Sequence, residues 1–155
     1  MRFFFIILLL CSCSSRRPED FKSKEYSYSF EKIGWRSIDP QGADKAYMNE
    51  ERGSVIMVNS LCRKYDSTGL EVLSNNFLGG LTELEVLQKN SITYKDREAY
   101  SLQSKGKLDG VTVFLNSLTS NRNHCTFDFV LISPLKVSEA DLKTYQELLE
   151  NIKFN

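Results

Sequence analysis

Residues 107–132 read KLDGVTVFLNSLTSNRNHCTFDFVLI, two largely apolar stretches separated by turn residues. In the second stretch alternate side chains share a face of a strand: Cys125, Phe127, Phe129 and Leu131 on one side, and Thr126, Asp128, Val130 and Ile132 on the other. Bends are expected at residues 120–123 and at Asp109-Gly110, which could instead be a bulge within a strand. Strands joined by short turns predict an antiparallel meander.

The segments before this meander continue the strand pattern. Strands are expected over residues 26–38, 43–49, 54–62, 82–88 and 91–103, the last broken by a turn at Lys95-Asp96-Arg97. A helix is expected between the third and fourth of these strands, with N-cap oxygens from residues 66–68 and an end at Gly79-Gly80. Its apolar residues Leu70, Leu73 and Phe77 predict one buried stripe.

A second helix closes the chain. Ser138-Glu139-Ala140-Asp141 has the form of a capping box, and Leu142, Tyr145, Leu149 and Ile152 follow at helical spacing. The order of strands, helix, meander and helix predicts a single α+β domain over residues 25–155. We expect an antiparallel sheet of six to seven strands flanked by two helices.

The amino terminus has the layout of a secretory signal. Arg2 precedes an unbroken apolar run over residues 3–10. A run of about ten residues covers roughly 15 Å as a helix, about half of a hydrocarbon core, so a cleaved signal peptide over residues 1–12 is favoured. A buried first helix is the alternative, but the run lacks a polar face.

The cleavage region Leu10-Cys11-Ser12-Cys13 resembles a lipobox, which implies lipidation of Cys13 in a bacterial lipoprotein. The rival Cys11 would place bulky Leu10 before the cut, where a small residue is needed. Ser14 instead of Asp after the anchor resembles the sorting signal of the outer membrane. We therefore expect a protein that is held by acyl chains on the periplasmic face of that membrane, with residues 13–24 as lipidated Cys and flexible tether.

Composition excludes some partners. Removing residues 1–12 from the 155 leaves 143 residues with 19 Lys and Arg against 20 Asp and Glu, a net charge of about −1. This charge gives no long-range field that would recruit nucleic acid, so no nucleic-acid partner is expected.

The cysteines predict a crosslink. With Cys13 acylated, Cys62 and Cys125 remain in a compartment where disulfides persist, and we predict that they pair. Two buried free thiols or a redox pair are the alternatives, although a redox pair favours a Cys-x-x-Cys spacing, which is absent.

No residue set predicts catalysis, a metal site or a cofactor. His124 adjoins Cys125, but neighbours in a strand point to opposite faces, and a metal site from His124 with Asp128 would lack a second nitrogen ligand. The carboxylate pairs Glu83 with Glu85 and Asp96 with Glu98 each share a strand face, which is best interpreted as a solvated surface. We expect a protein that is not an enzyme.

Aromatic residues gather in the first strands: Tyr26, Tyr28, Phe30, Trp35 and Tyr47. They could line a pocket for an apolar ligand or dock a protein partner. Core and strand-edge packing is the favoured interpretation.

Several segments together resemble the PsbP-like family of photosystem II extrinsic subunits and bacterial envelope lipoproteins of the DcrB type. The segments are residues 53–58, the helix from Ser67 to Gly79, residues 94–99, the meander to Ser133-Pro134 and the closing helix to Phe154. The paired cysteines are also similar to those of uncharacterised lipoproteins of deltaproteobacterial type. No metal-binding residue of the photosystem subunits maps onto this chain.

The resemblance and the address together imply a non-catalytic accessory subunit. We expect it to dock onto a membrane-associated envelope complex. The alternative is a carrier or sensor that holds a small apolar molecule or lipid between helix and sheet. A closed, dry pocket would favour the carrier, and an exposed apolar patch would favour docking.

Overall fold

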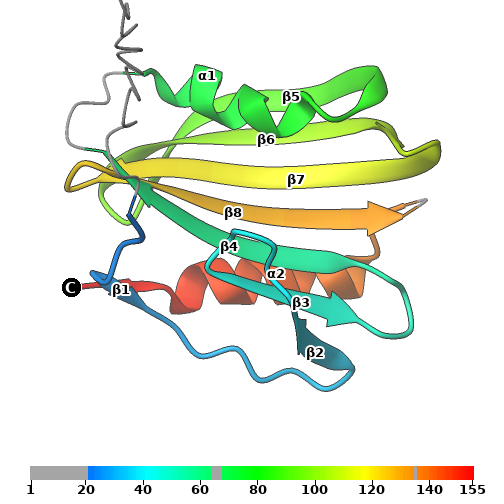
Figure 1. The fold of residues 1–155 in the computed structure, drawn as a ribbon, viewed down its shortest axis with the longest axis horizontal. Helices are drawn as coiled ribbons and strands as arrows, with labels where there is room; N and C mark the ends of the chain where they lie inside the picture. Colours follow the sequence, from blue (N-terminus) through cyan, green and yellow to red (C-terminus); the bar gives the residue numbers. More distant parts are fainter. Residues whose placement is uncertain (1–20, 64–67, 135) are drawn as a thin grey trace, which may run out of the picture.

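The computed structural model describes residues 21–63, 68–134 and 136–155 (Figure 1). These residues form a seven-stranded antiparallel sheet in the order β2-β3-β4-β8-β7-β6-β5, and a second sheet that pairs β1 with β9. The strands are β1 Tyr26–Ser27, β2 Trp35–Ile38, β3 Lys45–Asn49, β4 Val55–Cys62, β5 Thr82–Tyr94, β6 Arg97–Leu108, β7 Val111–Arg122, β8 Cys125–Pro134 and β9 Lys153–Phe154. The predicted α+β class and strand number are confirmed.

Three two-residue turns join β5 to β8. Both residues of each turn have positive φ: Lys95 with Asp96, Asp109 with Gly110, and Asn123 with His124. This conformation matches the twist of antiparallel hairpins, which explains why Asp, Asn and Gly recur there. Asp109-Gly110 is therefore a hairpin tip. The bend predicted at residues 120–123 lies later, because β7 continues to Arg122.

Two predicted strand boundaries are wrong. Residues 82–94 form one strand of 13 residues, with register shifts between Thr82 and Glu85 and between Val86 and Gln88. The predicted first strand over 26–38 is instead two short strands in different sheets. Alternation of apolar and polar residues marks where strand conformation is possible, but bulges and bends interrupt it without a distinct composition.

The main core lies between the sheet and α2, which spans Glu139–Asn151. Phe129, Leu131 and Ile56 are fully buried on this face, and the Tyr145 hydroxyl donates to the Phe129 carbonyl at 2.9 Å. The predicted cap is present, since the Ser138 hydroxyl accepts from the Asp141 amide at 3.0 Å. The capping box thus starts α2 where its apolar stripe can cover β8 and β4.

The opposite face of the sheet carries α1, Leu70–Asn75, which continues as a 3-10 turn over Asn76–Leu78 and contacts β6 and β7. Gly69 is its N-cap and supplies no side-chain hydrogen bond, while two of the predicted capping residues, 66 and 67, lie outside the described residues. The predicted stripe is half-buried, and Ser74 is the fully buried residue of α1. The two helices therefore make a three-layer arrangement with the sheet in the middle.

The last residues of the predicted flexible tether are packed. The Cys62 amide donates to the Phe21 carbonyl at 2.9 Å, and the Ser23 amide donates to the Ser60 hydroxyl at 2.8 Å. Residues 21–23 at the carboxyl end of the predicted tether thus run beside β4, while the side chains of Phe21, Lys22 and Lys24 stay exposed. Residues 1–20, which include the predicted signal peptide and Cys13, lie outside the described residues. In the described ranges, no helix combines the length and apolar composition that a bilayer span needs.

Candidate functional site

Exposed apolar side chains gather at one end of the sheet, around the turn between β6 and β7. This far-end patch consists of Leu84 (44% exposed), Val86 (45%), Leu108 (41%) and Val111 (55%). Leu108 and Val111 are direct cross-strand neighbours, and Val86 lies opposite Ser104 of β6. An ion pair between Lys107 and Glu83, 2.7 Å apart, lies beside the patch. Exposed apolar residues with a polar rim are typical of protein-binding surfaces.

A cleft of about 700 Å³ lies between α2 and the half of the sheet formed by β5, β6 and β7. Its wall on the helix includes Leu142, Tyr145 and Leu149, and its floor on the sheet includes Gln103 and Asn116. The cleft exists because α2 lies over β8 and leaves the neighbouring strands partly uncovered (Figure 1). It is open to solvent and as polar as it is apolar, so it is not the closed, dry pocket of a lipid carrier.

Asn116 is the distinctive residue of this cleft. Its side chain is 9% exposed and lies beside Gln103, its cross-strand neighbour on β6. Within the part of the chain that the structure describes, no side-chain hydrogen bond involves the Asn116 amide. The amide itself faces the open cleft, so water satisfies it there and a ligand can take the place of that water.

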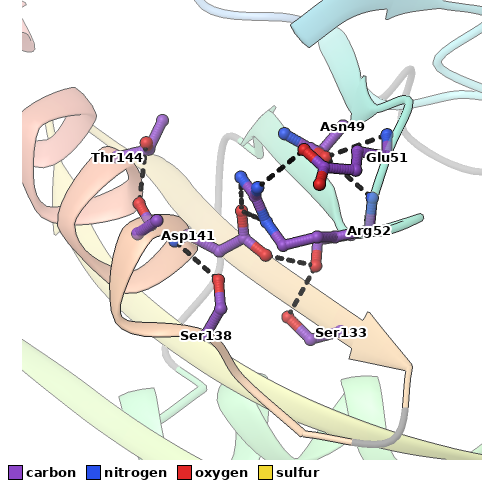
Figure 2. Close-up of polar contacts among 9 residues, drawn as sticks. Asn49, Glu51, Arg52, Ser133, Ser138, Asp141 and Thr144 are labelled. Atoms are coloured by element: carbon purple, nitrogen blue, oxygen red, sulfur yellow. Dashed lines mark hydrogen bonds and ion pairs between the residues drawn. The ribbon is translucent and has the colours of Figure 1, made fainter. Parts of the chain in front are cut away.

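An ion pair between a partly exposed arginine and a buried aspartate joins the β3–β4 loop to α2 (Figure 2). Arg52, in the loop between β3 and β4, donates from Nε and Nη2 to Oδ1 of Asp141 at 2.9 and 2.8 Å. The Ser54 hydroxyl donates to the other oxygen of Asp141 at 2.7 Å, and the Ser133 hydroxyl lies 3.1 Å from that of Ser54. Burial alone raises the pKa of Asp141, but the hydrogen bonds from Arg52 and Ser54 outweigh it and lower the pKa. Asp141 is therefore held ionised.

Sequence reasoning missed this pair. Arg52 falls between the strands expected over residues 43–49 and 54–62 and was given no role, and Asp141 was interpreted as part of a helix cap. The sequence carried no signal of the pair, because the burial of Asp141, which is 1% exposed and so needs a partner, is visible in the structure alone. The partner itself could not be predicted, since Arg52 lies 89 residues away along the chain.

The predicted disulfide is present. Cys62 and Cys125 are joined, and they lie directly opposite one another in the register of β4 with β8. The bond sits at the end of the sheet where Phe21 meets β4, opposite the far-end patch. It therefore holds β4 and β8 together at that end of the sheet.

His124 takes no part in a catalytic arrangement with Cys125, whose sulfur is in the disulfide. It is exposed and occupies a turn position with φ of 62° rather than the strand expected for it. Asp128 is instead buried on the α1 face between Thr119 and Asn59, which donate to its carboxylate at 3.1 and 3.3 Å. In residues 21–63, 68–134 and 136–155, no group of three His, Cys, Asp or Glu residues is placed to hold a metal ion.

The carboxylate pairs are not placed as predicted. A bulge separates Glu83 from Glu85, and Asp96 occupies a turn while Glu98 lies in β6. All four are exposed. They are solvated side chains that share no site.

The aromatic cluster packs against the core. Tyr26 meets Phe127 edge-on with ring centroids 5.3 Å apart, and Phe30 lies against Tyr47 at 4.2 Å and beside Trp35. Burial raises the pKa of Tyr26 and Tyr28. Tyr26, Tyr28, Phe30 and Trp35 pack against the core, as the favoured interpretation expects, while Tyr26, Tyr28 and Tyr47 also line an open depression of about 530 Å³.

Comparison with known proteins gives fold neighbours alone. No family model matches the chain, and no curated protein matches it. Among solved structures, PsbP of the cyanobacterium Synechocystis is similar with a TM-score of 0.58 and 12% identity, covering 94% of this chain and 99% of that one. Mog1p of Saccharomyces cerevisiae, described as a Ran-binding protein, matches with a TM-score of 0.58 and 14% identity, covering 89% and 96%.

A third neighbour is LpqN of Mycobacterium tuberculosis, described as involved in cell envelope biogenesis. Its TM-score is 0.54 and its identity 12%, with coverage of 84% of this chain and 83% of that one. At such low identities the match shows shared architecture and not shared activity. The chain therefore has the PsbP-like α+β fold, in which its antiparallel sheet is flanked by two helices.

Proposed function

We propose that the protein is a lipid-anchored, non-catalytic accessory protein of the bacterial envelope that docks onto a protein partner through its far-end patch. This proposal rests on the positions of two features, which lie at opposite ends of the sheet. The chain enters beside Cys62, whereas the far-end patch surrounds the β6–β7 turn at the other end (Figure 1). A strand such as β7, with 12 residues, spans roughly 40 Å.

The anchor supports this orientation. Lipidation of Cys13 would attach the chain to the membrane eight residues before Phe21. Since eight residues span at most about 28 Å, the entry point of the domain stays near the bilayer and the far-end patch points away from it. LpqN, which shares the fold, is described as acting in cell envelope biogenesis, and this is compatible with an envelope role.

A binding role is also compatible with the neighbours. Mog1p has a similar architecture and is described as Ran-binding, so a protein of this fold can serve protein recognition. The patch here has side chains that are 41% to 55% exposed. Burying them against a partner would gain about 25 cal/mol for each square ångström of apolar area.

The test is site-specific crosslinking in intact cells with the anchor retained. A photoreactive residue at position 107 should capture one stoichiometric envelope protein. Val111→Glu should abolish capture, because it places a charge in the apolar contact, whereas Val72→Glu on α1 should leave it unchanged. Val72 is the matched control, since it is 58% exposed but lies outside the far-end patch. Equal capture by both variants would refute docking through this surface.

A second candidate function is carriage of a small molecule that is partly apolar. The observation that favours it is the cleft beside α2, where the Asn116 amide faces solvent and can bond to a ligand. Native mass spectrometry of protein extracted from membranes should then show a bound small molecule, and Asn116→Leu should release it. An unliganded spectrum for protein purified in several mild detergents would remove this candidate.

A further inference from the structure

The end of the domain where the chain enters has a distinct surface, which we call the entry end. Phe21 pairs with Cys62, Cys62 lies opposite Cys125, and Cys125 lies opposite Arg122. The next strand, β6, begins there with Arg97. Since neighbouring strands are about 4.8 Å apart, Phe21 and Arg97 lie on the order of 20 Å from one another along this edge.

A pocket of about 340 Å³ opens at the entry end beside the disulfide. Its lining consists of Arg97, Asn121, Arg122, Asn123, His124, Cys125 and Thr126. Both charged side chains in this lining are arginines, and no carboxylate is among the lining residues. Guanidinium groups and side-chain amides are the donors that proteins use for phosphate oxygens.

The two arginines are held differently. Arg122 donates from Nη2 to the Lys95 carbonyl at 2.6 Å, and its guanidinium lies over the Phe154 ring at 4.5 Å. These contacts orient it and leave further donors for a ligand. In the described ranges, no ion pair or side-chain hydrogen bond involves Arg97. Two cations therefore face one pocket with no acidic partner between them.

The carboxylates of the entry end are directed elsewhere. Glu98 follows Arg97 along β6 and so lies on the opposite face of the sheet. Asp96 occupies the β5–β6 turn beside Lys95, and Glu25 accepts a hydrogen bond from the Asn123 amide at 2.8 Å. None of the three carboxylates lines this pocket, although Glu25 lies at its rim beside Asn123, and Asp96 and Glu98 line a neighbouring depression with Arg97.

Distance to the membrane then favours one occupant. Attachment at Cys13 leaves at most about 28 Å of chain before Phe21. Phe21 is itself an apolar ring that is 59% exposed at the point of entry. An exposed ring on the same edge of the sheet as two arginines matches a bilayer interface, where acyl chains meet phosphate groups.

We propose that the entry end lies on the bilayer, with the Arg97–Arg122 pocket holding the phosphate of a phospholipid headgroup and Phe21 in the interface. This inference rests on the lipid anchor of the proposed function. It adds a second, non-covalent contact, which fixes how the domain stands on the membrane.

The test uses the full lipidated protein in vesicles of phosphatidylethanolamine and phosphatidylglycerol, and in phosphate-free maltoside micelles. Flotation of the vesicles reports the anchor, and hydrogen–deuterium exchange reports the contact. Amides of the turns at 95–96 and 123–124 should exchange more slowly on vesicles than in micelles. The expected slowing is on the order of fivefold for each cation at an anionic surface.

Arg97→Glu should remove this slowing while flotation persists. Its matched control is Lys105→Glu, which reverses a charge on the same strand and the same face toward the far-end patch. Slowing that survives in Arg97→Glu, or that is lost equally in Lys105→Glu, would overturn the inference and leave the anchor standing. Failure of the wild-type protein to float would overturn the anchor and this inference together.

A further arm separates lipid from free phosphate. Inorganic phosphate added to protein in maltoside micelles should leave exchange at both turns unchanged, because an isolated ion lacks the bilayer contacts of Phe21. Full protection by inorganic phosphate would overturn the headgroup assignment in favour of a soluble anion.

Discussion

Two buried carboxylates show that the groups around an aspartate decide whether it is ionised. Asp141 is ionised because Arg52 and Ser54 donate to it. Asp128 is bonded by the neutral donors Thr119 and Asn59, and burial raises its pKa from 3.8 to about 6 despite these hydrogen bonds and the nearby charge of Lys22. A carboxylate that loses water and gains no direct cationic partner favours its protonated form.

Asp128 therefore predicts a pH dependence of stability. Its folded pKa lies above the unfolded value, so the folded state binds the proton more tightly. The associated stability is present below about pH 4 and is lost as the pH rises through 6. The free energy of unfolding at this site should fall by about 1–3 kcal/mol over that interval. Asp128→Asn should flatten the slope in urea denaturation measured from pH 4 to 7, and an unchanged slope would contradict this assignment.

Cys13 carries the prediction about the anchor. Cys13→Ala should move the protein from the membrane fraction to the soluble fraction, because no acyl chain can then be attached. Cys11→Ala is the matched control and should leave the protein on the membrane. Retention of the Cys13→Ala variant in washed membranes would show that the lipobox interpretation is wrong.

At the scale of elements, the hairpins were predictable and their limits were not. Asp109-Gly110 announces a turn because glycine adopts positive φ without strain, and the structure places a hairpin tip there. Asn123-His124 gave a weaker signal, since histidine is not a typical residue for such a position, and the bend was predicted too early. The continuity of β5 through Lys89 and Asn90 could not be predicted, because pairing with β6 overrides their low strand propensity.

The contact between α2 and the β3–β4 loop gives a prediction for an element pair. Arg52→Ala leaves Asp141 buried without its cation and should lower the free energy of unfolding by about 2–4 kcal/mol. Arg36→Ala is the matched control: the ion pair of Arg36 with Glu50 has side chains that are 53% and 64% exposed, so its loss should cost below about 1 kcal/mol. Chemical denaturation of the two variants measures these free energies. Equal losses of stability in both variants would show that the Arg52–Asp141 pair does not position α2.

For the whole molecule, the fold class could be predicted from the order of elements and from the PsbP-like resemblance. The cleft and the far-end patch could not be predicted in this way. The cleft arises from the position of α2 over β8, and the far-end patch from how β5, β6 and β7 end together. No local sequence pattern predicts the position of α2 over β8 or the alignment of these strand ends. Cysteine pairing was predictable because, with Cys11 and Cys13 set aside, two thiols remained for one bond.

The disulfide gives the prediction at this scale. Mass spectrometry without reductant should show the Cys62 and Cys125 peptides linked, and alkylation of both thiols in native protein would contradict the structure. The bond joins residues 63 apart in sequence, for which loop-closure entropy predicts a stabilisation of about 4 kcal/mol. The melting temperature of the Cys62→Ala/Cys125→Ala variant should therefore fall by several degrees or more.

The same bond determines how a mechanical load would travel. A pull applied through the amino terminus can stretch the chain ahead of Cys62 once the Phe21 contacts give way. When the opposing force acts at the carboxyl terminus, the covalent crosslink diverts the tension into β8, so the segment between the two cysteines, with α1 and strands β5 to β7, carries no load. If a partner instead holds the far-end patch, which lies within that segment, the force reaches the patch by two covalent routes from Cys62: along the chain through α1 into β5, and across the disulfide through β8 into β7.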